Sequence, residues 1–415
     1  MIDKPNAQLL AALLTAVLAL PQSAVSGELV REQRSALAAF PAPPGCERVM
    51  APVLPLRTAP PAATAFLPPQ LEVRTPFEPT VIPSGGRNYL VYELHLRNYA
   101  GEPLDLQGLE VIAGDGTGDR LATFDADQLI SLFFPRGHEL STDEVVQSRQ
   151  LAVGQGTVAY LCLAFEVGVA VPAALRHRVI MADAYADGPS IATRQTKMQV
   201  LAPPVEGADW IATSGPGNTG HHRVGLLVIA GNARISRRYA IDWKKVREGT
   251  TFIGDPIKVQ SHIAYGQRVF AVADSLVVAA ADGFPDNIPR TSKGFETAVP
   301  VTMETIAGNT ITLDLGNGQY ALYAHLAPGS VQVKAGDRVK GGDFLGRIGN
   351  SGDSREPHLH FEVTDSPNLL AGEGLPYLID HYEIRSQDGS LDARASELPL
   401  LGMPINFRPA EAKSN

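Results

Sequence analysis

Apolar and polar residues alternate in short runs over much of the chain. The runs NYLVYELHLRNY (88–99) and GTVAYLCLAFEVG (156–168) are separated by turn-rich clusters such as GDGTGD (114–119). Alternation with a period of two predicts β-strands, and short strands with turns at this spacing favour a β-sandwich. Helical periodicity is nearly absent. We therefore predict an all-β protein in which residues 84–203 form a β-sandwich domain.

A second β-rich domain is expected over residues 204–385. Its segment HRVGLLVIAGNARISRRYAIDW (222–243) predicts two strands joined by a tight turn at Gly231-Asn232. Strands are also expected within the ranges 268–283, 310–326, 333–349 and 358–365. The sequence thus predicts two β domains that follow one another along the chain.

The N-terminal residues have the layout of a secretory signal peptide. Residues 8–20 (QLLAALLTAVLAL) form an apolar run that follows Lys4 and precedes the small residues Ala24 and Ser26. This run is shorter than the roughly 20 residues that span a bilayer. We therefore expect a signal peptide over residues 1–26 and a periplasmic or secreted protein. A buried helix and an uncleaved anchor are the alternatives.

Proline-containing segments flank the predicted domains. Prolines in residues 27–83 deny the backbone N–H groups that a ladder needs, so we expect a linker with at most a first edge strand. Residues 386–415 have no clear pattern and are expected to form a tail. No stretch after the signal peptide is long and apolar enough to predict a transmembrane segment.

Composition narrows the classes of partner. The 415 residues are 44% hydrophobic and 19% charged, with a formal net charge of −9. An acidic balance offers no broad basic face, so nucleic acid is not an expected partner. Cys46 and Cys162 are too few for a disulfide framework or a cysteine-based zinc site, and whether they form one bridge is left open.

Candidate chemistry concentrates in the second domain, where six of the ten histidines lie between positions 221 and 360. His358 and His360 are two residues apart, so on a strand their side chains share one face and suit a metal ligand beside a base. Asp242 stands between Ile241 and Trp243, where a buried carboxylate needs a cation, a hydrogen-bond donor or a metal. Two exposed histidines on a polar face are the alternative for the HxH motif.

The segments YAHL (323–326) and VKAGDRVKGGDFLGRIGNSGDSREPHLHFEV (333–363) resemble the lysostaphin/LytM-type zinc metallopeptidases, which cleave peptide cross-bridges of bacterial peptidoglycan. The resemblance covers about residues 204–370. It implies an antiparallel β-sheet of the duplicated-hybrid-motif type. It also implies that Asp242 and His360 bind Zn²⁺ and that His325 and His358 are the catalytic pair.

One position departs from the family's first zinc motif, HxxxD. Arg238 stands where a histidine is expected four residues before Asp242, and a guanidinium has no lone pair for a metal. On one strand this spacing would point Arg238 toward the site. Arg238 could then pair with Asp242 in a metal-free protein, or grip a carboxylate of the substrate.

The predicted hairpin offers a substitute third ligand. A turn at Gly231-Asn232 places His221 opposite Asp242, and a shift of one residue brings in His222 instead. The segment GPGNTGHHR…RRYAIDW resembles a branch of extracytoplasmic relatives, which favours His222. An exposed strand end is the alternative for this histidine pair.

The remaining histidines receive no function. We interpret them as strand, loop or surface residues: His95, His138, His177, His262 and His381.

Two functional hypotheses follow from the sequence. The first is a zinc-dependent endopeptidase that hydrolyses peptide bonds of peptidoglycan stem or cross-bridge peptides. The second is a metal-free pseudoenzyme of the same fold that binds cell-wall peptides or a partner protein, for which an Arg238–Asp242 pair would be the signature.

Overall fold

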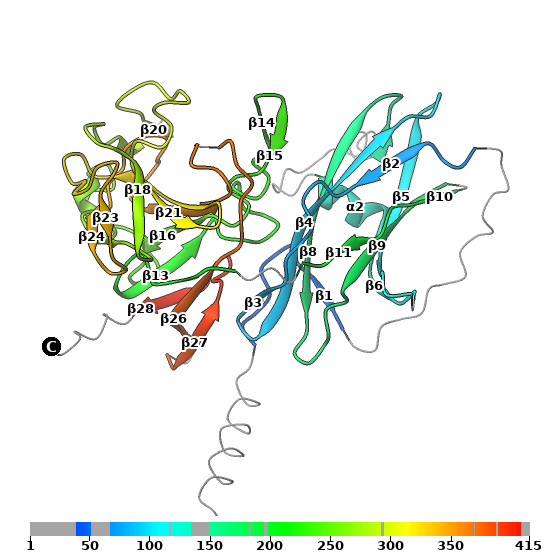
Figure 1. Cartoon of the computed structure of the whole chain (residues 1–415), viewed down its shortest axis with the longest axis horizontal. Coiled ribbons are helices and arrows are strands. Elements are labelled where there is room, and N and C mark those ends of the chain that lie inside the picture. Colours follow the sequence, from blue (N-terminus) through cyan, green and yellow to red (C-terminus); the bar gives the residue numbers. More distant parts are fainter. Residues whose placement is uncertain are drawn as a thin grey trace, which may run out of the picture. The chain divides into compact units, whose positions relative to one another are not determined.

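Strands dominate the computed structural model of the chain (Figure 1). The structure describes residues 39–50, 67–116, 118–133, 149–182, 184–194, 198–291, 294–368, 370–386 and 389–407. The helices that lie wholly within these ranges are α2 (Ala126–Phe133) and the short 3-10 helix η1 (Val259–Ser261). The prediction of an all-β protein is confirmed. The predicted signal peptide, His138 and parts of the predicted linker lie outside the described residues.

Two sheets form the N-terminal part. The first has the order β1-β8-β4-β2, with β3 paired to β4, and β1 runs parallel to β8. Its strands are β1 (Glu47–Val49), β2 (Leu71–Arg74), β3 (Ile82–Ser84), β4 (Arg87–Asn98) and β8 (Gly156–Phe165). The second has the order β10-β9-β5-β6, with β11 paired to β9 and β7 paired to β5. Its strands are β5 (Leu104–Ala113), β6 (Arg120–Asp125), β7 (Gln150–Leu151), β9 (Ala174–Met181), β10 (Tyr185–Asp187) and β11 (Ile191–Ala192).

The first sheet is buried on both faces. Alternate residues of β4, such as Leu90 and Tyr92, join the hydrophobic cluster shared with the second sheet. Tyr89 and Val91, which point the other way, join the cluster built around the C-terminal strands. Double-sided burial explains why the run YLCLAF in β8 is almost wholly apolar, because neither face has to meet water.

A disulfide bond attaches the segment before β1 to this sheet. Cys46 and Cys162 are bonded across 116 residues of sequence, with a Cα–Cα distance of 4.5 Å. The sequence left this pairing open, and the structure resolves it.

The C-terminal sheet has eleven strands in the order β12-β26-β28-β13-β16-β25-β22-β21-β18-β23, with β27 paired to β26. Only β12 and β26 are parallel neighbours. The strands are β12 (Val200–Leu201), β13 (Gly207–Thr213), β16 (Ile241–Lys245), β18 (Ser275–Ala281), β21 (Asn309–Gly316), β22 (Gln319–Leu326), β23 (Arg338–Val339), β25 (Leu359–Thr364), β26 (Leu378–Arg385), β27 (Leu391–Glu397) and β28 (Pro404–Phe407).

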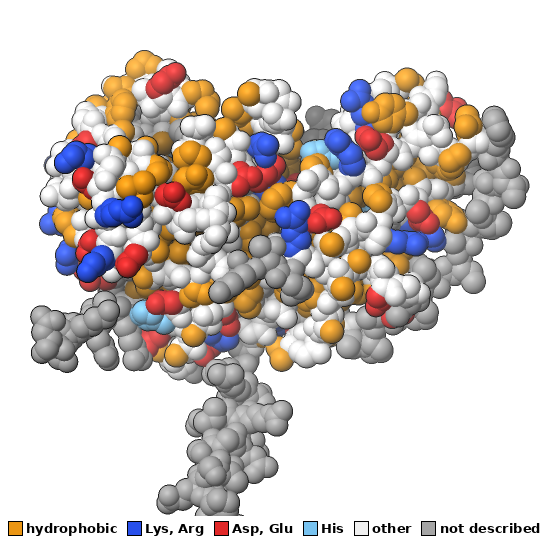
Figure 2. All heavy atoms as spheres, viewed as in Figure 1, with side chains coloured by type: hydrophobic (Ala, Val, Ile, Leu, Met, Phe, Trp, Pro, Cys, Tyr) orange, Lys and Arg blue, Asp and Glu red, His pale blue; other side chains and the backbone are white. Residues whose placement is uncertain are grey.

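Three two-stranded ladders accompany this sheet. They are β14 (Leu227–Ile229) with β15 (Asn232–Arg234), β17 (Arg268–Phe270) with β24 (Phe344–Arg347), and β19 (Ile288–Thr291) with β20 (Gly294–Glu296). On the face drawn in Figure 2, lysine and arginine side chains are interspersed with aspartate and glutamate. No helix among the described residues is long and apolar enough to cross a membrane.

The chain forms strands in both segments where the sequence pattern predicted little regular structure. The expected linker contains β1, β2 and the short β3, and the expected C-terminal tail contains β27 and β28. Strands of three or four residues carry little periodic signal, and β1 and β28 pair with strands far away in the sequence, whereas β27 pairs with the preceding β26. Phe407 is 1% exposed, and its ring packs edge-on against Trp243 at a centroid distance of 5.2 Å.

Replacement of this phenylalanine measures how far the C-terminal segment contributes to the core. We expect Phe407→Ala to lower the free energy of unfolding by about 3–5 kcal/mol, because it leaves a cavity beside Trp243. Leu391→Ala in β27, which also pairs with β26, is the control, because Leu391 is 50% exposed. Urea unfolding of the two variants should separate them clearly, and equal midpoints would contradict the packing described.

Candidate metal centre

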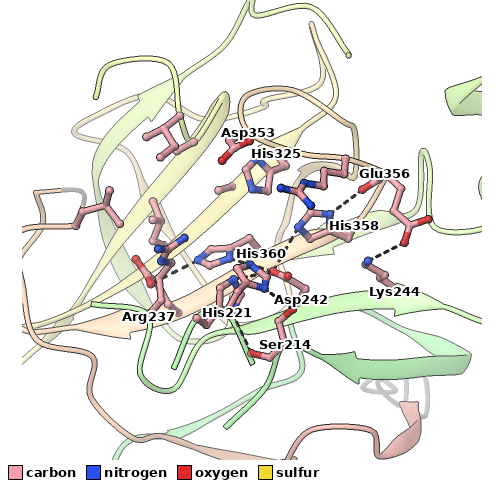
Figure 3. Close-up of a pocket in the computed structure, with 18 residues that line it drawn as sticks. Ser214, His221, Arg237, Asp242, Lys244, His325, Asp353, Glu356, His358 and His360 are labelled. Atoms are coloured by element: carbon pink, nitrogen blue, oxygen red, sulfur yellow. Dashed lines mark hydrogen bonds and ion pairs between the residues drawn. The ribbon is translucent and has the colours of Figure 1, made fainter. Parts of the chain in front are cut away.

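Neighbouring strands of the C-terminal sheet bring the predicted site residues together. Asp242 in β16 lies opposite His360 in β25, and β25 pairs in turn with β22, which carries His325. Figure 3 shows these side chains around one hollow, a cavity of about 530 Å³. His358 and His360 both line it, as expected for residues two apart.

Three imidazoles converge on one carboxylate oxygen. Oδ1 of Asp242 lies 3.0 Å from Nδ1 of His360, 3.3 Å from Nε2 of His358 and 3.5 Å from Nε2 of His222. Asp242 is only 4% exposed, so its charge depends on these neighbours rather than on water. Burial alone would raise the pKa of Asp242, but His222 and His358 hold it well below its usual range.

Backbone carbonyls orient three of the rings. Nδ1 of His222 lies 3.0 Å from the Ser214 oxygen, and Nδ1 of His325 lies 2.8 Å from the Ser351 oxygen. Nδ1 of His358 lies 2.7 Å from the Glu356 oxygen. A carbonyl only accepts, so each Nδ1 donates and Nε2 is the ring nitrogen that remains available to a metal or for proton exchange.

His360 is held differently, between two carboxylates. Its Nδ1 faces Asp242, and its Nε2 lies 3.5 Å from Oε2 of Glu362. Burial opposes the charged ring, but the hydrogen bonds to Asp242 and Glu362 raise the pKa of His360 to about 9. By contrast, burial lowers the pKa of His222 and of His325 well below the usual value for histidine. A carboxylate behind a metal-binding imidazole is a common second partner.

The histidine pair reaches Asp242 by a route other than the predicted one. In the hairpin β14–β15, Ile229 pairs with Asn232, so the turn residues are Ala230 and Gly231, with φ of 48° and 81°. The predicted turn at Gly231-Asn232 is therefore wrong by one residue. The ladder also ends at Leu227, and His221 and His222 lie in a separate turn, so neither extends the ladder opposite Asp242.

Both histidines of the pair nevertheless lie beside Asp242. His221, His222 and Asp242 offer ligand atoms that all fall within 4.8 Å of one another. His222 is 3% exposed, whereas His221 is exposed and its Nδ1 lies 3.3 Å from the Ser214 hydroxyl.

Arg238 does not point at the site, contrary to the expectation from its spacing. Residues 236–239 form a turn, so the alternation of a strand does not hold between Arg238 and Asp242. The Arg238 guanidinium instead lies 2.8 Å from Glu93 and 2.8 Å from Glu373. The Arg238–Asp242 pair, on which the metal-free hypothesis rested, is not the arrangement found.

The other histidines differ in their surroundings. His262, expected in a loop or on the surface, is 3% exposed, and its Nε2 lies 3.0 Å from the Pro256 oxygen. His381 is exposed. His177 is buried, with Nε2 2.8 Å from the hydroxyl of Tyr92, and His95 lies on β4. None of these four histidines lines the cavity.

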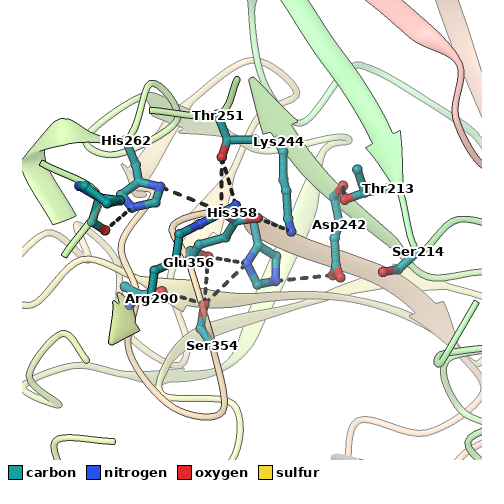
Figure 4. A network of polar contacts seen from close by, with 12 residues as sticks. Thr213, Ser214, Asp242, Lys244, Thr251, His262, Arg290, Ser354, Glu356 and His358 are labelled. Carbon is teal, nitrogen blue, oxygen red and sulfur yellow. Dashed lines mark hydrogen bonds and ion pairs between the residues drawn. The ribbon is translucent and has the colours of Figure 1, made fainter. Parts of the chain in front are cut away.

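Sequence reasoning missed Glu356, which anchors the backbone behind His358 (Figure 4). Its carboxylate lies 2.7 Å from Nζ of Lys244, 3.0 Å from the Thr251 hydroxyl and in a short contact with Arg290. The carbonyl of the same residue accepts from His358. Glu362 was also overlooked, although its position two residues after His360 on one strand predicts that both side chains share a face.

His325 adopts a backbone conformation that is unusual for its residue type. Its φ is +64°, in the left-handed region that favours glycine. Its N–H donates to the Ala307 oxygen at 3.0 Å, and its carbonyl accepts from the Gly349 N–H at 3.0 Å. The surrounding backbone thus fixes the ring where Nε2 faces the cavity.

A family comparison identifies part of this domain. Residues 259–369 match peptidase family M23, and they include His325, His358 and His360 but neither His222 nor Asp242. The glycyl-glycine endopeptidase ALE-1 of Staphylococcus capitis is 42% identical over 74 residues, which are 17% of this chain and 20% of that protein. The peptidoglycan DD-endopeptidase ShyA of Vibrio cholerae is 33% identical over 79 residues, 19% of this chain and 18% of that one.

These matches span about a fifth or less of each relative's length. They confirm the resemblance to the lysostaphin/LytM-type family for this part of the chain. Among solved structures, the lysostaphin catalytic domain of Staphylococcus simulans is 24% identical, with coverage of 38% of this chain and 80% of that chain and a TM-score of 0.20. A peptidase M23 structure from Pseudomonas aeruginosa is 15% identical. The match covers 63% of this chain and 86% of that chain, with a TM-score of 0.23.

The ion pairs of Glu356 make the stability of the fold depend on pH. Burial opposes its charge, but Lys244 and Arg290 lower the pKa of Glu356 to about 2, against 4.5 for an ordinary glutamate. A lowered pKa stabilises the fold above pH 4.5, and this stability is lost as the pH falls toward about 2. With allowance for solvent screening at Arg290, we expect Glu356→Gln to lower the free energy of unfolding by about 1–2 kcal/mol at neutral pH.

The same comparison at about pH 3 should show a smaller difference, because the glutamate of the unfolded wild-type chain is then mostly protonated, whereas the folded carboxylate with its lower pKa is still charged. Glu296→Gln, which changes an exposed carboxylate on β20, is the control and should have little effect. A Glu356→Gln difference that does not change with pH would contradict this account. Chemical unfolding at each pH provides the measurement.

Proposed function

We propose that the chain is a zinc-dependent endopeptidase that hydrolyses peptide bonds of peptidoglycan stem or cross-bridge peptides. The observation that carries this proposal is the convergence of three buried imidazoles on the carboxylate of Asp242, in a domain of the M23 type. The relatives named above, ALE-1 and ShyA, are endopeptidases by name, and ShyA acts on peptidoglycan. A periplasmic or secreted location would give the enzyme access to this substrate.

The ligands we assign to zinc are His222, Asp242 and His360. The set of two imidazoles and one carboxylate suits Zn²⁺ and leaves an open position for catalysis. His222 has its Nε2 free because Nδ1 faces the Ser214 oxygen, and Nδ1 of His360 lies on the Asp242 side of its ring. His221 is the alternative third ligand, but its exposure and its contact with the Ser214 hydroxyl favour a place at the rim.

Bound zinc would polarise the scissile carbonyl and lower the pKa of water to about 7. His358 would take the proton of the attacking water at Nε2, because the Glu356 carbonyl keeps the other ring proton on Nδ1. His325 would stand opposite, with its ring centroid 4.9 Å from that of His358. Once protonated at Nε2, His325 would stabilise the oxyanion or pass a proton to the leaving amine.

The metal-free alternative loses the observation that motivated it. It required Arg238 to neutralise Asp242, but Arg238 pairs with Glu93 and Glu373. Without a permanent cation beside it, the buried Asp242 is better matched to a metal.

The roles assigned to His358 and His360 predict that their replacement affects zinc binding and activity differently, although both rings line one cavity. We expect His360→Ala to lose bound zinc, because it removes a ligand. We expect His358→Ala to retain zinc and to hydrolyse peptidoglycan about 10²–10⁴-fold more slowly, because it removes a base. Metal analysis of the purified proteins and digestion of isolated peptidoglycan, with products separated by chromatography, are the measurements.

His381→Ala, which changes an exposed histidine outside the cavity, is the matched control for both variants. Equal zinc loss in the His358→Ala and His360→Ala proteins would refute the assignment of roles. Wild-type protein that takes up no zinc after reconstitution would refute the proposed function.

Zinc affinity should also depend on pH. The pKa of about 9 for the metal-free His360 means that this ring carries an extra proton at neutral pH, which zinc has to displace. We therefore expect zinc affinity to fall about tenfold for each unit of decreasing pH below that value. Competition with a chelator of known affinity between about pH 6 and about pH 8 tests the slope. A constant affinity over this range would show that no such proton is displaced.

A further inference from the structure

A buried carboxylate on the N-terminal sheet holds two arginines of the C-terminal part. Glu93 in β4 is 2% exposed and receives Arg238 through Nη2 at 2.8 Å. Its other oxygen receives Nη1 of Arg223 in a short contact. Arg223 is 1% exposed and Arg238 is 2% exposed, so water screens none of these charges. A carboxylate at this place could not be removed without leaving two buried cations with fewer partners.

Arg223 is the residue that directly follows His222. Its Nη2 donates to the Tyr92 oxygen at 2.6 Å and approaches the Leu161 oxygen at 3.3 Å. The guanidinium therefore contacts β4 and the neighbouring β8 at once. The side chains of these two adjacent residues point in different directions. His222 faces Asp242, whereas Arg223 contacts the N-terminal sheet.

A second contact holds the segment just before this turn. Nδ2 of Asn218 donates to the Tyr160 oxygen at 2.5 Å, and Asn218 is 2% exposed. The Arg223 guanidinium also lies 5.1 Å from the Tyr160 ring. The turn that carries His222 is thus fixed, through Arg223 within it and Asn218 just before it, to strands that lie outside the M23-matched residues 259–369.

We propose that Glu93 and Arg223 are positioning residues of the metal centre, and that the N-terminal sheet is thereby a structural part of it. Through Arg223, Glu93 fixes the backbone of His222 so that Nε2 is directed at Asp242. This inference rests on the proposed zinc site. It gives the N-terminal part a role in completing the ligand set, in place of the histidine that Arg238 replaces.

Replacement of the arginine by an apolar residue of similar length isolates this effect. In Arg223→Met, Glu93 keeps its pair with Arg238, so the carboxylate retains a cation. We expect zinc affinity to fall by about 10–100-fold, as is typical when a partner behind a ligand is lost. Arg223→Lys, which keeps a cation for Glu93, should recover part of the loss. Chelator competition on protein whose fold has been checked by circular dichroism gives the affinities.

The matched control is Arg120→Met. Arg120 pairs with Glu110 at 2.7 Å within the second N-terminal sheet, where the two side chains are 10% and 9% exposed. The Arg120→Met variant should have a lower free energy of unfolding but an unchanged zinc affinity. A fall in zinc affinity equal to that of Arg223→Met would show that general destabilisation, rather than positioning of His222, weakens the site.

A double variant tests whether Arg223 affects zinc binding through His222 or in another way. If Arg223 acts through His222, the protein with both His222→Ala and Arg223→Met should bind zinc no more weakly than His222→Ala alone. Additive losses would overturn the proposal. If Arg223→Met does not fold, Asn218→Ala removes the other tether without exposing a buried charge. It should lower zinc affinity in the same direction, and unchanged affinity would again overturn the proposal.

The failure of this inference can be distinguished from failure of the proposed function. If the wild-type protein binds zinc and Arg223→Met binds it with the same affinity, only the positioning role is overturned. Wild-type protein that binds no zinc would overturn both.

Discussion

Two buried carboxylates impose the constraint around which the C-terminal site is arranged. A charge removed from water has to be surrounded by donors or cations, because its desolvation is otherwise too costly. Asp242 is surrounded by three imidazoles, and Glu93 is surrounded by two guanidinium groups. These two clusters are joined by the step from His222 to Arg223. The position of one cluster therefore limits the position of the other.

The two-sided burial of the first N-terminal sheet allows this connection. Because β4 is covered on both faces, Leu90 and Tyr92 pack into one core while Tyr89 and Val91 pack into the other. Glu93 continues the series of Tyr89 and Val91, so its carboxylate faces the C-terminal strands. A charged residue at this place in an apolar run is unfavourable unless partners from another part of the chain reach it, and Arg223 and Arg238 do so.

The sequence patterns predicted the all-β class and the strands that carry His360 and His325, with His358 directly before the first residue of β25. They succeeded because alternation along one strand is local, so the shared face of His358 and His360 follows from their spacing. The turn at Ala230-Gly231 was misplaced because alanine rarely adopts a positive φ, whereas a Gly-Asn turn is common. The direction of Arg238 was wrong because its partner Glu93 is 145 residues away, and no local pattern records that distance. Strand β28 was missed for the same reason, since its partner β13 lies far away in the sequence, whereas β27 pairs with the preceding β26.

The backbone of His325 has a consequence for how the domain could be altered. A residue other than glycine in the left-handed region costs about 1–3 kcal/mol, and His325 is held there by hydrogen bonds at its N–H and its carbonyl. Glycine would relieve this strain but would have no ring to exchange protons. Selection for thermal robustness alone would therefore favour an inert protein at this position, and directed evolution of the domain would need to screen turnover together with stability.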